Sequence, residues 1–218
     1  MIVDLVNNVF EKKEMKGFIQ SEGPILTRHS QYDLNSSLPA GIEKVEELLG
    51  SILLTTPSAF NSQPVRMVLL IGPAHHRHWD LIKSLLIGKI GEEKYADGTA
   101  DKIQGFRNAA GTVLFFDDEL VTKSLQERFP TYAHNFPLWA EQVQGSHQYA
   151  AWLGLVGLGF GANLQHYTGL DDDRVREDAG VPSEHRFIAE LVFGGMNSDT
   201  GEEKEKEPLS KTLRVVSE

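Results

Sequence analysis

Apolar side chains recur at helical spacing between residues 42 and 53 and then form a continuous run from residue 67 to residue 71. The first set follows three- and four-residue steps and comprises Ile42, Val45, Leu48, Leu49, Ile52 and Leu53. This spacing predicts an amphipathic helix, and the run that follows predicts a buried strand. Pro57 and Pro64 bound the segment between them, because proline stops a helix and cannot donate a backbone hydrogen bond. The pattern therefore predicts a helix, a polar loop and a strand in succession.

The loop over residues 56–64 carries two hydroxyls and two amides within six positions. They belong to Ser58, Asn61, Ser62 and Gln63. A polar loop between two buried elements suits a site that binds a flat, polar ring. The same residue types also suit an ordinary turn, and the loop alone does not separate the two interpretations.

Two further apolar runs predict buried strands, at residues 111–116 and 187–193, and a strand is also expected over residues 162–166. Helical patterns cover residues 2–10, the stretch from His75 towards Gly88, and residues 140–158, whereas the polar residues 92–105 predict a loop. The latter half of 140–158 is apolar nearly all round and its small residues permit close helix packing, which predicts a central helix or a dimer interface. We find no internal repeat and no linker, which predicts a single domain over residues 1–218.

Aromatic side chains gather between residues 129 and 139. They are Phe129, Tyr132, Phe136 and Trp139, with two prolines among them. One interpretation is a loop pinned by its own rings, and the other is a wall of a pocket for a flat ligand.

The composition excludes several classes of function. The chain of 218 residues has no cysteine, which excludes disulfides, thiolate catalysis and cysteine-ligated metals. Its net charge of −10 argues against nucleic acid and anionic membrane as partners. No secretory signal and no apolar run of about 20 residues is present, so we expect a soluble, cytoplasmic protein.

Two motifs that suggest ligands are rejected on their context. His75, His76 and His78 point in different directions on a helix, so we expect a solvated helix start and no metal site. The glycines from Gly157 to Gly161 are spaced like a dinucleotide fingerprint, but a helix precedes them and a strand follows, which is the reverse of that motif.

Several segments, in their order and spacing, resemble the FMN-dependent nitroreductase family over about residues 24–216. The resemblance is carried by Arg28-His29-Ser30, residues 56–64, Gly157-Leu158-Gly159 and Gly194. Residues 112–117, 136–139 and 164–167 are similar to the subgroup of fatty-acid-repression-mutant-like and copper-induced nitroreductases. The chain departs from the family at Tyr32, where a basic residue is frequent, and in residues 1–27, which form a divergent N-terminal extension.

The resemblance implies an α+β fold with a mixed sheet between helices. It also implies a homodimer with a helical interface and two flavin sites. Arg28, His29 and Ser30 match the phosphate end of the FMN site, and Lys204 and Lys206 fall where the family places further basic residues. Leu164, Gln165 and His166 match the segment against the flavin ring.

The other half of the implied cofactor site comes from the second subunit. Ser58 and Asn61, with Gln63 as a weaker candidate, match the loop that reaches the ring from there. Arg107, or Lys102 in its place, is the candidate cation near flavin N1. Phe129, Tyr132, Phe136 and Trp139 border the implied substrate pocket.

The implied activity is reduction of nitroaromatic compounds or quinones with electrons from NAD(P)H. Hydride passes through flavin N5 in a ping-pong cycle, so no side chain is required as catalytic acid or nucleophile. The alternative is a flavin-binding regulatory or stress-response protein with slow or no turnover. A structural homodimer without flavin would not need Arg28, Ser30, Ser58 and Asn61 together.

Overall fold

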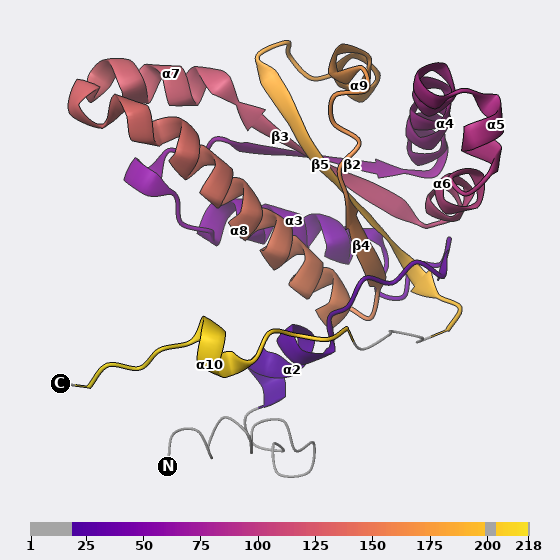
Figure 1. The fold of residues 1–218 in the computed structure, drawn as a ribbon, viewed down its shortest axis with the longest axis horizontal. Coiled ribbons are helices and arrows are strands. Elements are labelled where there is room, and N and C mark those ends of the chain that lie inside the picture. Colours follow the sequence, from indigo (N-terminus) through magenta and orange to yellow (C-terminus); the bar gives the residue numbers. More distant parts are fainter. Residues whose placement is uncertain (1–18, 199–203, 218) are drawn as a thin grey trace.

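The computed structural model describes residues 19–198 and 204–217 (Figure 1). Its sheet consists of β1 (Leu34–Asn35), β2 (Val65–Ile71), β3 (Gly111–Asp118), β4 (Gly161–Gln165) and β5 (His185–Met196). The strand order is β1-β5-β3-β2, and β4 also pairs with β5. The expected α+β class is confirmed, as are the strands expected over 67–71, 111–116, 162–166 and 187–193.

The strand directions differ from the expected mixed sheet. All four strand pairings in residues 19–198 are antiparallel. The reason is that the connections from β2 to β3 and from β3 to β5 each return the chain to the end of the sheet at which the preceding strand finished, so the next strand runs in the opposite direction.

Helices surround this sheet. They are α2 (Ile19–Thr27), α3 (Ile42–Thr55), η1 (Ala59–Asn61), α4 (Gly72–Ile90), α5 (Glu92–Ala96), α6 (Ala100–Arg107), α7 (Glu119–Arg128), η2 (Pro130–Asn135), α8 (Phe136–Gly157), α9 (Asp172–Ala179) and α10 (Leu209–Thr212). The helices expected at residues 42–53 and 140–158 are confirmed as α3 and α8. Residues 92–105, expected as a loop, instead form α5 and most of α6. The helix expected over residues 2–10 lies outside the described residues.

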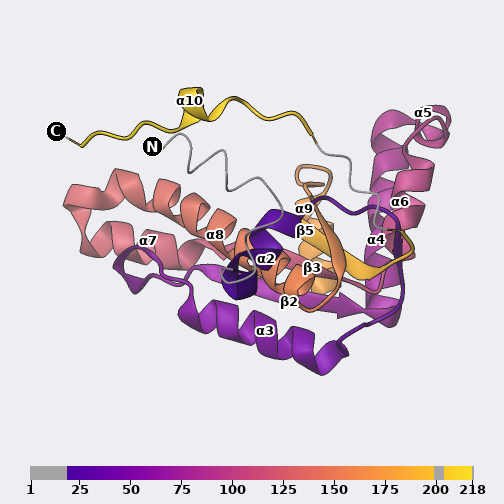
Figure 2. The ribbon, with the colours of Figure 1, turned by 90° about the horizontal axis from the view of Figure 1, so that it is seen from below.

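Two separate cores cover the two faces of the sheet. On the face that we call the α4 face, Trp79 and Phe106 pack with Leu114 and Phe116 of β3. On the opposite α8 face, α3 and α8 pack on the alternate side chains of β3, namely Val113 and Phe115. This alternation is what a strand buried on both faces produces. Figure 2 shows α4, α5 and α6 grouped at one end of the molecule, away from α7 and α8.

The close helix packing expected from small residues is found between α3 and α8. A side-chain carbon added at Gly154 would overlap Leu48 of α3. The chain therefore depends on glycine at this point of α8 for the distance between the two helices.

The start of α4 is not solvated, contrary to the expectation for its histidines. His75 and His78 are fully buried on the α4 face, while His76 is half-buried. The reason is that α4 begins at Gly72, so positions 75, 78 and 79 share its inner face. None of the described helices combines the length and the hydropathy that a membrane span requires.

A register shift interrupts the pairing of β3 with β5. Phe115 lies opposite Ala189, but Phe116 lies opposite Phe187, so Ile188 is an extra residue on β5. Such a bulge changes which side chains face which side of the sheet.

Candidate functional site

The segment after α2 lies against β4. The backbone N–H of Gln31 donates to the carbonyl of Ala162 at 3.0 Å, and the side-chain amide of Asn163 donates to the carbonyl of Gln31 at 2.7 Å. These bonds hold residues 28–30 beside the strand that continues into residues 164–166. The structure therefore places Gln31, which follows Arg28, His29 and Ser30, against the strand that carries Leu164 and Gln165 and leads to His166.

Arg28 is seated on an aromatic ring of α8. Its guanidinium carbon lies 4.4 Å from the centre of the Trp152 ring. Stacking on the flat face leaves the N–H groups at the edge of the guanidinium able to bind an anion. Within residues 19–198 and 204–217, no carboxylate forms an ion pair with Arg28. Its charge is thus available for a phosphate.

The residues that follow β5 are hydrogen-bonded to the segment after Ser30. Asp33 accepts hydrogen bonds from the hydroxyl of Ser198 at 2.6 Å and from the side-chain amide of Asn197 at 2.8 Å, and these bonds lower the pKa of the Asp33 carboxyl. The C-terminal segment therefore leaves the sheet close to residues 31–33. Lys204 and Lys206 lie in that segment and are exposed.

The two candidate cations for the flavin ring, Arg107 and Lys102, differ in their surroundings. Arg107 makes a two-pronged pair with Asp80 of α4, at 2.8 and 3.2 Å, and this directs it along the surface of α4. The ammonium of Lys102 lies 5.9 Å from the ring centre of Tyr32 and 5.5 Å from that of Phe106. Lys102 is thus the cation that faces the segment following Ser30.

The loop over residues 56–64 has an unusual backbone. Phe60, Asn61 and Gln63 all have positive φ, of 57°, 52° and 50°. This conformation costs a residue with a side chain about 1–2 kcal/mol. Ser58 helps to hold the loop, because its hydroxyl accepts from the backbone N–H of Gln63 at 3.0 Å. Strain of this kind is concentrated at functional sites in proteins.

The aromatic residues expected to border a substrate pocket meet around Phe60. The ring centre of Phe60 lies 4.9 Å from Phe129, 5.9 Å from Tyr132, 5.4 Å from Phe136 and 6.0 Å from Trp139. Phe60 itself is 50% exposed. Sequence reasoning missed Phe60, and the available signal was a lone aromatic residue in an otherwise polar loop.

The two halves of the expected cofactor site lie far apart in one chain. Trp139, which stacks on Phe60, and Trp152, which carries Arg28, are both on α8 and thirteen residues apart. At the rise of an α-helix this is about 20 Å. The loop with Ser58 and Asn61 and the segment with Arg28 and Ser30 thus occupy opposite ends of α8.

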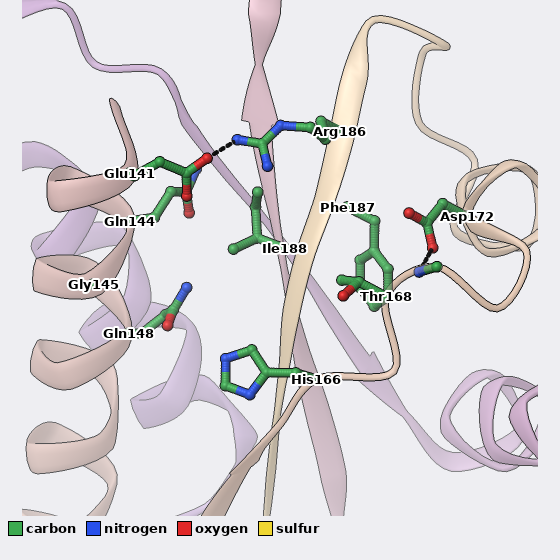
Figure 3. A pocket seen from close by; sticks show the side chains of 11 residues that line it. Glu141, Gln144, Gly145, Gln148, His166, Thr168, Asp172, Arg186, Phe187 and Ile188 are labelled. Atoms are coloured by element: carbon green, nitrogen blue, oxygen red, sulfur yellow. Dashed lines mark hydrogen bonds and ion pairs between the residues drawn. The ribbon is translucent and has the colours of Figure 1, made fainter. Parts of the chain in front are cut away.

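A cavity of about 520 Å³ opens between α8, β5 and the connection from β4 to α9. Figure 3 shows His166 pointing across it towards Gln148 of α8, with Ile188 between them and Arg186. The buried amide of Gln144 donates to the carbonyl of Phe116 at 3.0 Å, while its oxygen has no partner in the described part of the chain. The cavity therefore offers polar groups beside the segment expected at the ring.

Charged side chains close one end of this cavity. Arg186 pairs with Glu141 of α8 and reaches Asp117 at 3.4 Å. Burial raises the pKa of the Asp117 carboxyl, and the positive charge of Arg186 opposes this effect. Arg186 thus links α8 to the sheet at the mouth of the cavity.

Comparison with known proteins identifies the family. The nitroreductase family model matches residues 25–195. The nitroreductase FRM2 of Saccharomyces cerevisiae is 37% identical over 172 residues, which cover 78% of this chain and 84% of FRM2. A second protein of that yeast, HBN1, is 33% identical over 180 residues, 82% of this chain and 89% of HBN1.

Solved structures agree with this family assignment. The nitroreductase CinD from Lactococcus lactis, in complex with nicotinic acid, is 34% identical with a TM-score of 0.82 and covers 91% of this chain and 100% of CinD. The FMN-dependent nitroreductase NfnB from Mycobacterium smegmatis, in complex with NADPH, is 16% identical and shares the fold, with a TM-score of 0.67 over 90% of this chain and 98% of NfnB. The chain is an oxidoreductase that belongs to the nitroreductase family.

Proposed function

We propose that this chain is an FMN-dependent oxidoreductase that reduces nitroaromatic compounds or quinones with electrons from NAD(P)H, and that two copies of the chain form each cofactor site. The observation that carries the proposal is the separation of the two halves of the site along α8. Arg28 sits at one end and the strained loop at the other, about 20 Å away. A second copy would bring its loop to the first copy's Arg28.

The residues near Arg28 suit the phosphate end of FMN. The guanidinium of Arg28 has no carboxylate partner among the described residues, and a guanidinium binds phosphate through paired N–H groups. The hydroxyl of Ser30 adds a neutral donor. Lys204 and Lys206 are exposed and follow Ser198, which is fastened beside this segment. The positive charge of Arg28 and the hydroxyl of Ser30 are the groups of this segment that suit a phosphate.

The residues near His166 suit the binding of the flavin ring. Leu164 offers an apolar contact, and Gln165 and His166 continue the same strand edge. Ser58, Asn61 and Gln63 of the second copy would contribute polar contacts from the opposite side. We infer that Lys102, rather than Arg107, stabilises negative charge on the bound ring, because Lys102 lies beside Tyr32 whereas Arg107 is already paired with Asp80.

FMN, when bound, supplies a ring that carries two electrons from the nicotinamide to the acceptor. The protein's task is then to bind, orient and exclude water, and no side chain is needed as an acid or nucleophile. NAD(P)H and the acceptor would occupy the same place in turn.

The aromatic cluster around Phe60 supports a flat acceptor. Phe129, Tyr132 and Trp139 offer accessible ring surface, which favours stacking with an aromatic compound, whereas Phe136 is buried and packs against Phe60 and Trp139. CinD has also been solved with 4-nitrophenol and with chloramphenicol, at 34% and 35% identity. Both are small molecules, and NfnB was solved with NADPH.

The visible absorption spectrum of the purified protein tests the proposal. We expect a bound-flavin spectrum that bleaches on anaerobic addition of NADPH or NADH and recovers when a nitroaromatic compound or a quinone is added. A protein that is colourless and takes up no added FMN would refute the cofactor. Flavin that is bound but is not bleached by either nicotinamide would refute the electron donor.

A further inference from the structure

A group of buried polar side chains lies on the α4 face, directly behind the segment expected at the ring. It consists of His75, His78 and Trp79 of α4, Thr112 of β3 and Glu190 of β5. All are almost completely inaccessible to solvent. Burial of a carboxyl and two imidazoles in an apolar core costs free energy unless their polar atoms are hydrogen-bonded.

Thr112 satisfies one side of this group. Its hydroxyl oxygen accepts from the indole N–H of Trp79 at 3.0 Å and lies 2.9 Å from Nδ1 of His75. The other side is incompletely satisfied. Both ring nitrogens of His78 and the Oε1 atom of Glu190 have no hydrogen-bond partner in the described residues.

Glu190 connects this group to the chain next to residues 164–166, which are expected to lie against the flavin ring. Its Oε2 accepts the backbone N–H of Tyr167 at 3.2 Å. Tyr167 follows His166, and its ring packs on Trp79 with the centres 5.8 Å apart. Oε1 of Glu190 lies 3.9 Å from Nε2 of His78. One carboxyl thus faces both the connection after β4 and helix α4.

The two partners at 3.9 Å are not an ion pair at neutral pH. Burial raises the pKa of Glu190 to about 8, against the opposing effect of the Tyr167 N–H. Burial lowers the pKa of His78 to about 3 and that of His75 to about 4. All three groups are therefore neutral near pH 7, and the Glu190 carboxyl carries a proton.

The charges around Glu190 reinforce this state. At the start of α9, Asp172 raises the pKa of Glu190 further, and on the connection from β4 to α9 the Tyr167 hydroxyl is itself neutral, with a pKa of about 12. From β4, the neutral amide of Gln165 lies opposite Glu190. Near His75, the positive charge of Arg107 on α6 disfavours protonation of the imidazole. No described neighbour offers a positive charge to an ionised Glu190.

We propose that Glu190 is a positioning residue for the cofactor site, which in its protonated form holds the backbone N–H of Tyr167 with Oε2 and directs the proton on Oε1 towards Nε2 of His78. The inference rests on the proposed function. The gap of 3.9 Å exceeds a hydrogen bond by about 1 Å, which a small rotation of the carboxyl closes. Residues 165–167 would then be anchored through the core to α4.

Ionisation would keep the bond from the Tyr167 N–H but remove the contact with His78. A carboxylate has no proton for His78 and leaves a negative charge buried behind the ring segment. We therefore expect the cofactor to be held less firmly above the pKa of Glu190.

The test compares two substitutions in the full-length protein loaded with FMN. Glu190→Gln keeps a neutral acceptor for Tyr167 and a donor for His78, whereas Glu190→Leu removes both. The dissociation constant of FMN is measured by flavin fluorescence between pH 6 and 9.5. We expect the wild type to lose affinity as the pH rises above about 8, by at most about tenfold per pH unit. Glu190→Gln should match the wild type at pH 7 without this loss.

Glu190→Leu should bind FMN about tenfold more weakly at all pH values, as the loss of one anchoring hydrogen bond predicts. Glu177→Gln, an exposed carboxylate on α9, is the matched control and should keep the wild-type pH dependence. The same alkaline loss in Glu190→Gln, or unchanged binding in Glu190→Leu, would overturn the inference.

Amide hydrogen exchange of Tyr167 separates this inference from the proposed function. Exchange should be faster in Glu190→Leu and unchanged in Glu190→Gln. A wild-type protein that takes up no FMN would overturn the proposed function and the cofactor part of the inference. Equal exchange in all three proteins would overturn the anchoring of Tyr167 whether or not FMN binds.

Discussion

The guanidinium of Arg28 stacks on the indole of Trp152, with its central carbon 4.4 Å from the ring centre. Contacts of this kind contribute about 0.5–2 kcal/mol. More importantly, the ring fixes where the positive charge lies, because Trp152 belongs to the 22-residue helix α8. The helix thereby sets the position of the charge relative to β4.

Replacing Arg28 should therefore weaken FMN binding strongly. Arg28→Gln removes the charged hydrogen bonds to phosphate, and we expect a loss of affinity of about 10- to 100-fold. Trp152→Phe, which keeps a ring face, should cost less than Trp152→Leu. Fluorescence titration with FMN measures all three. Lys123→Gln on the exposed face of α7 is the control, and an equal loss there would mean that bulk charge, not this contact, determines affinity.

Mixing two defective variants tests whether two copies share a site. Arg28→Gln damages one half and Asn61→Gly the other, and glycine tolerates the positive φ of 52° at residue 61. If the halves come from different copies, each mixed dimer has one intact and one doubly damaged site. Equal, random mixing should then restore about a quarter of the sites. Recovery is measured as bound flavin and nitroreductase activity. No recovery in verified mixed dimers would show that each site lies within one chain.

Phe60 should matter for the aromatic acceptor. Phe60→Ala removes the ring that four others contact, so we expect KM for a nitroaromatic compound to rise about five- to tenfold, in line with about 1 kcal/mol per aromatic pair. Leu138→Ala, also exposed and near the same helix end, should change KM little. Steady-state kinetics with 4-nitrophenol derivatives decides between them. Similar effects of both substitutions would assign the change to lost apolar surface in general.

Thr112 should be important for stability. Thr112→Val keeps the shape but removes the hydroxyl that accepts from Trp79 and contacts His75, which leaves buried polar groups unsatisfied. We expect the free energy of unfolding to fall by about 2–4 kcal/mol. Urea unfolding measures it, with Thr55→Val on the exposed end of α3 as the control. A loss below about 0.5 kcal/mol would contradict the assigned hydrogen bonds.

The buried histidines and Glu190 also predict a maximum of stability near pH 6.5. His75 and His78 have pKa values lowered from 6.5 to about 4 and about 3, so the unfolded chain binds more protons and stability rises with pH up to 6.5. Glu190 has its pKa raised from 4.5 to about 8, so the folded chain binds the extra proton and stability falls with pH between 4.5 and 8. Above pH 6.5 only the fall remains.

Glu190→Gln should remove that fall. Between pH 6.5 and 8 the wild type should lose up to about 1.4 kcal/mol per pH unit relative to the variant, which is the effect of one proton. Urea unfolding at pH 5, 6.5 and 8 measures the difference. Parallel curves for the two proteins would show that Glu190 is not protonated in the folded state.

The elements and the meeting of the aromatic residues were predictable where the sequence pattern is periodic or concentrated. The helix at residues 42–53 and the strands with continuous apolar runs were predictable, because burial on one or both faces produces a periodic or continuous apolar pattern in the sequence. The four aromatic residues between 129 and 139 were predicted together and do meet. The position of Phe60 at the centre of these rings was not predictable, because its contacts depend on a positive φ that no sequence pattern indicates.

Other features depend on tertiary contacts that a single sequence does not contain. The polar residues 92–105 became helical because Tyr95, Ile103 and Phe106 reach the α4 face, although their neighbours are charged. His75 and His78 were expected in solvent because histidine is polar, whereas the start of α4 turned their side of the helix inward. The pairing of Arg28 with Trp152 joins residues 124 positions apart and left no local signal.

Ile188, the extra residue of β5, gives the two parts of this strand different frames of alternation. Residues 185–187 follow one frame and residues 189–196 the other. Phe187 belongs to the core of the α4 face and Ala189 to that of the α8 face, although they are only two residues apart. Strict alternation of side chains along the whole of β5 would therefore assign one half of this strand to the wrong face. Loss of Ile188 would leave residues 185–187 opposite the same residues of β3, so the bulge itself, and not the facing of its neighbours, is what this one residue adds to the strand.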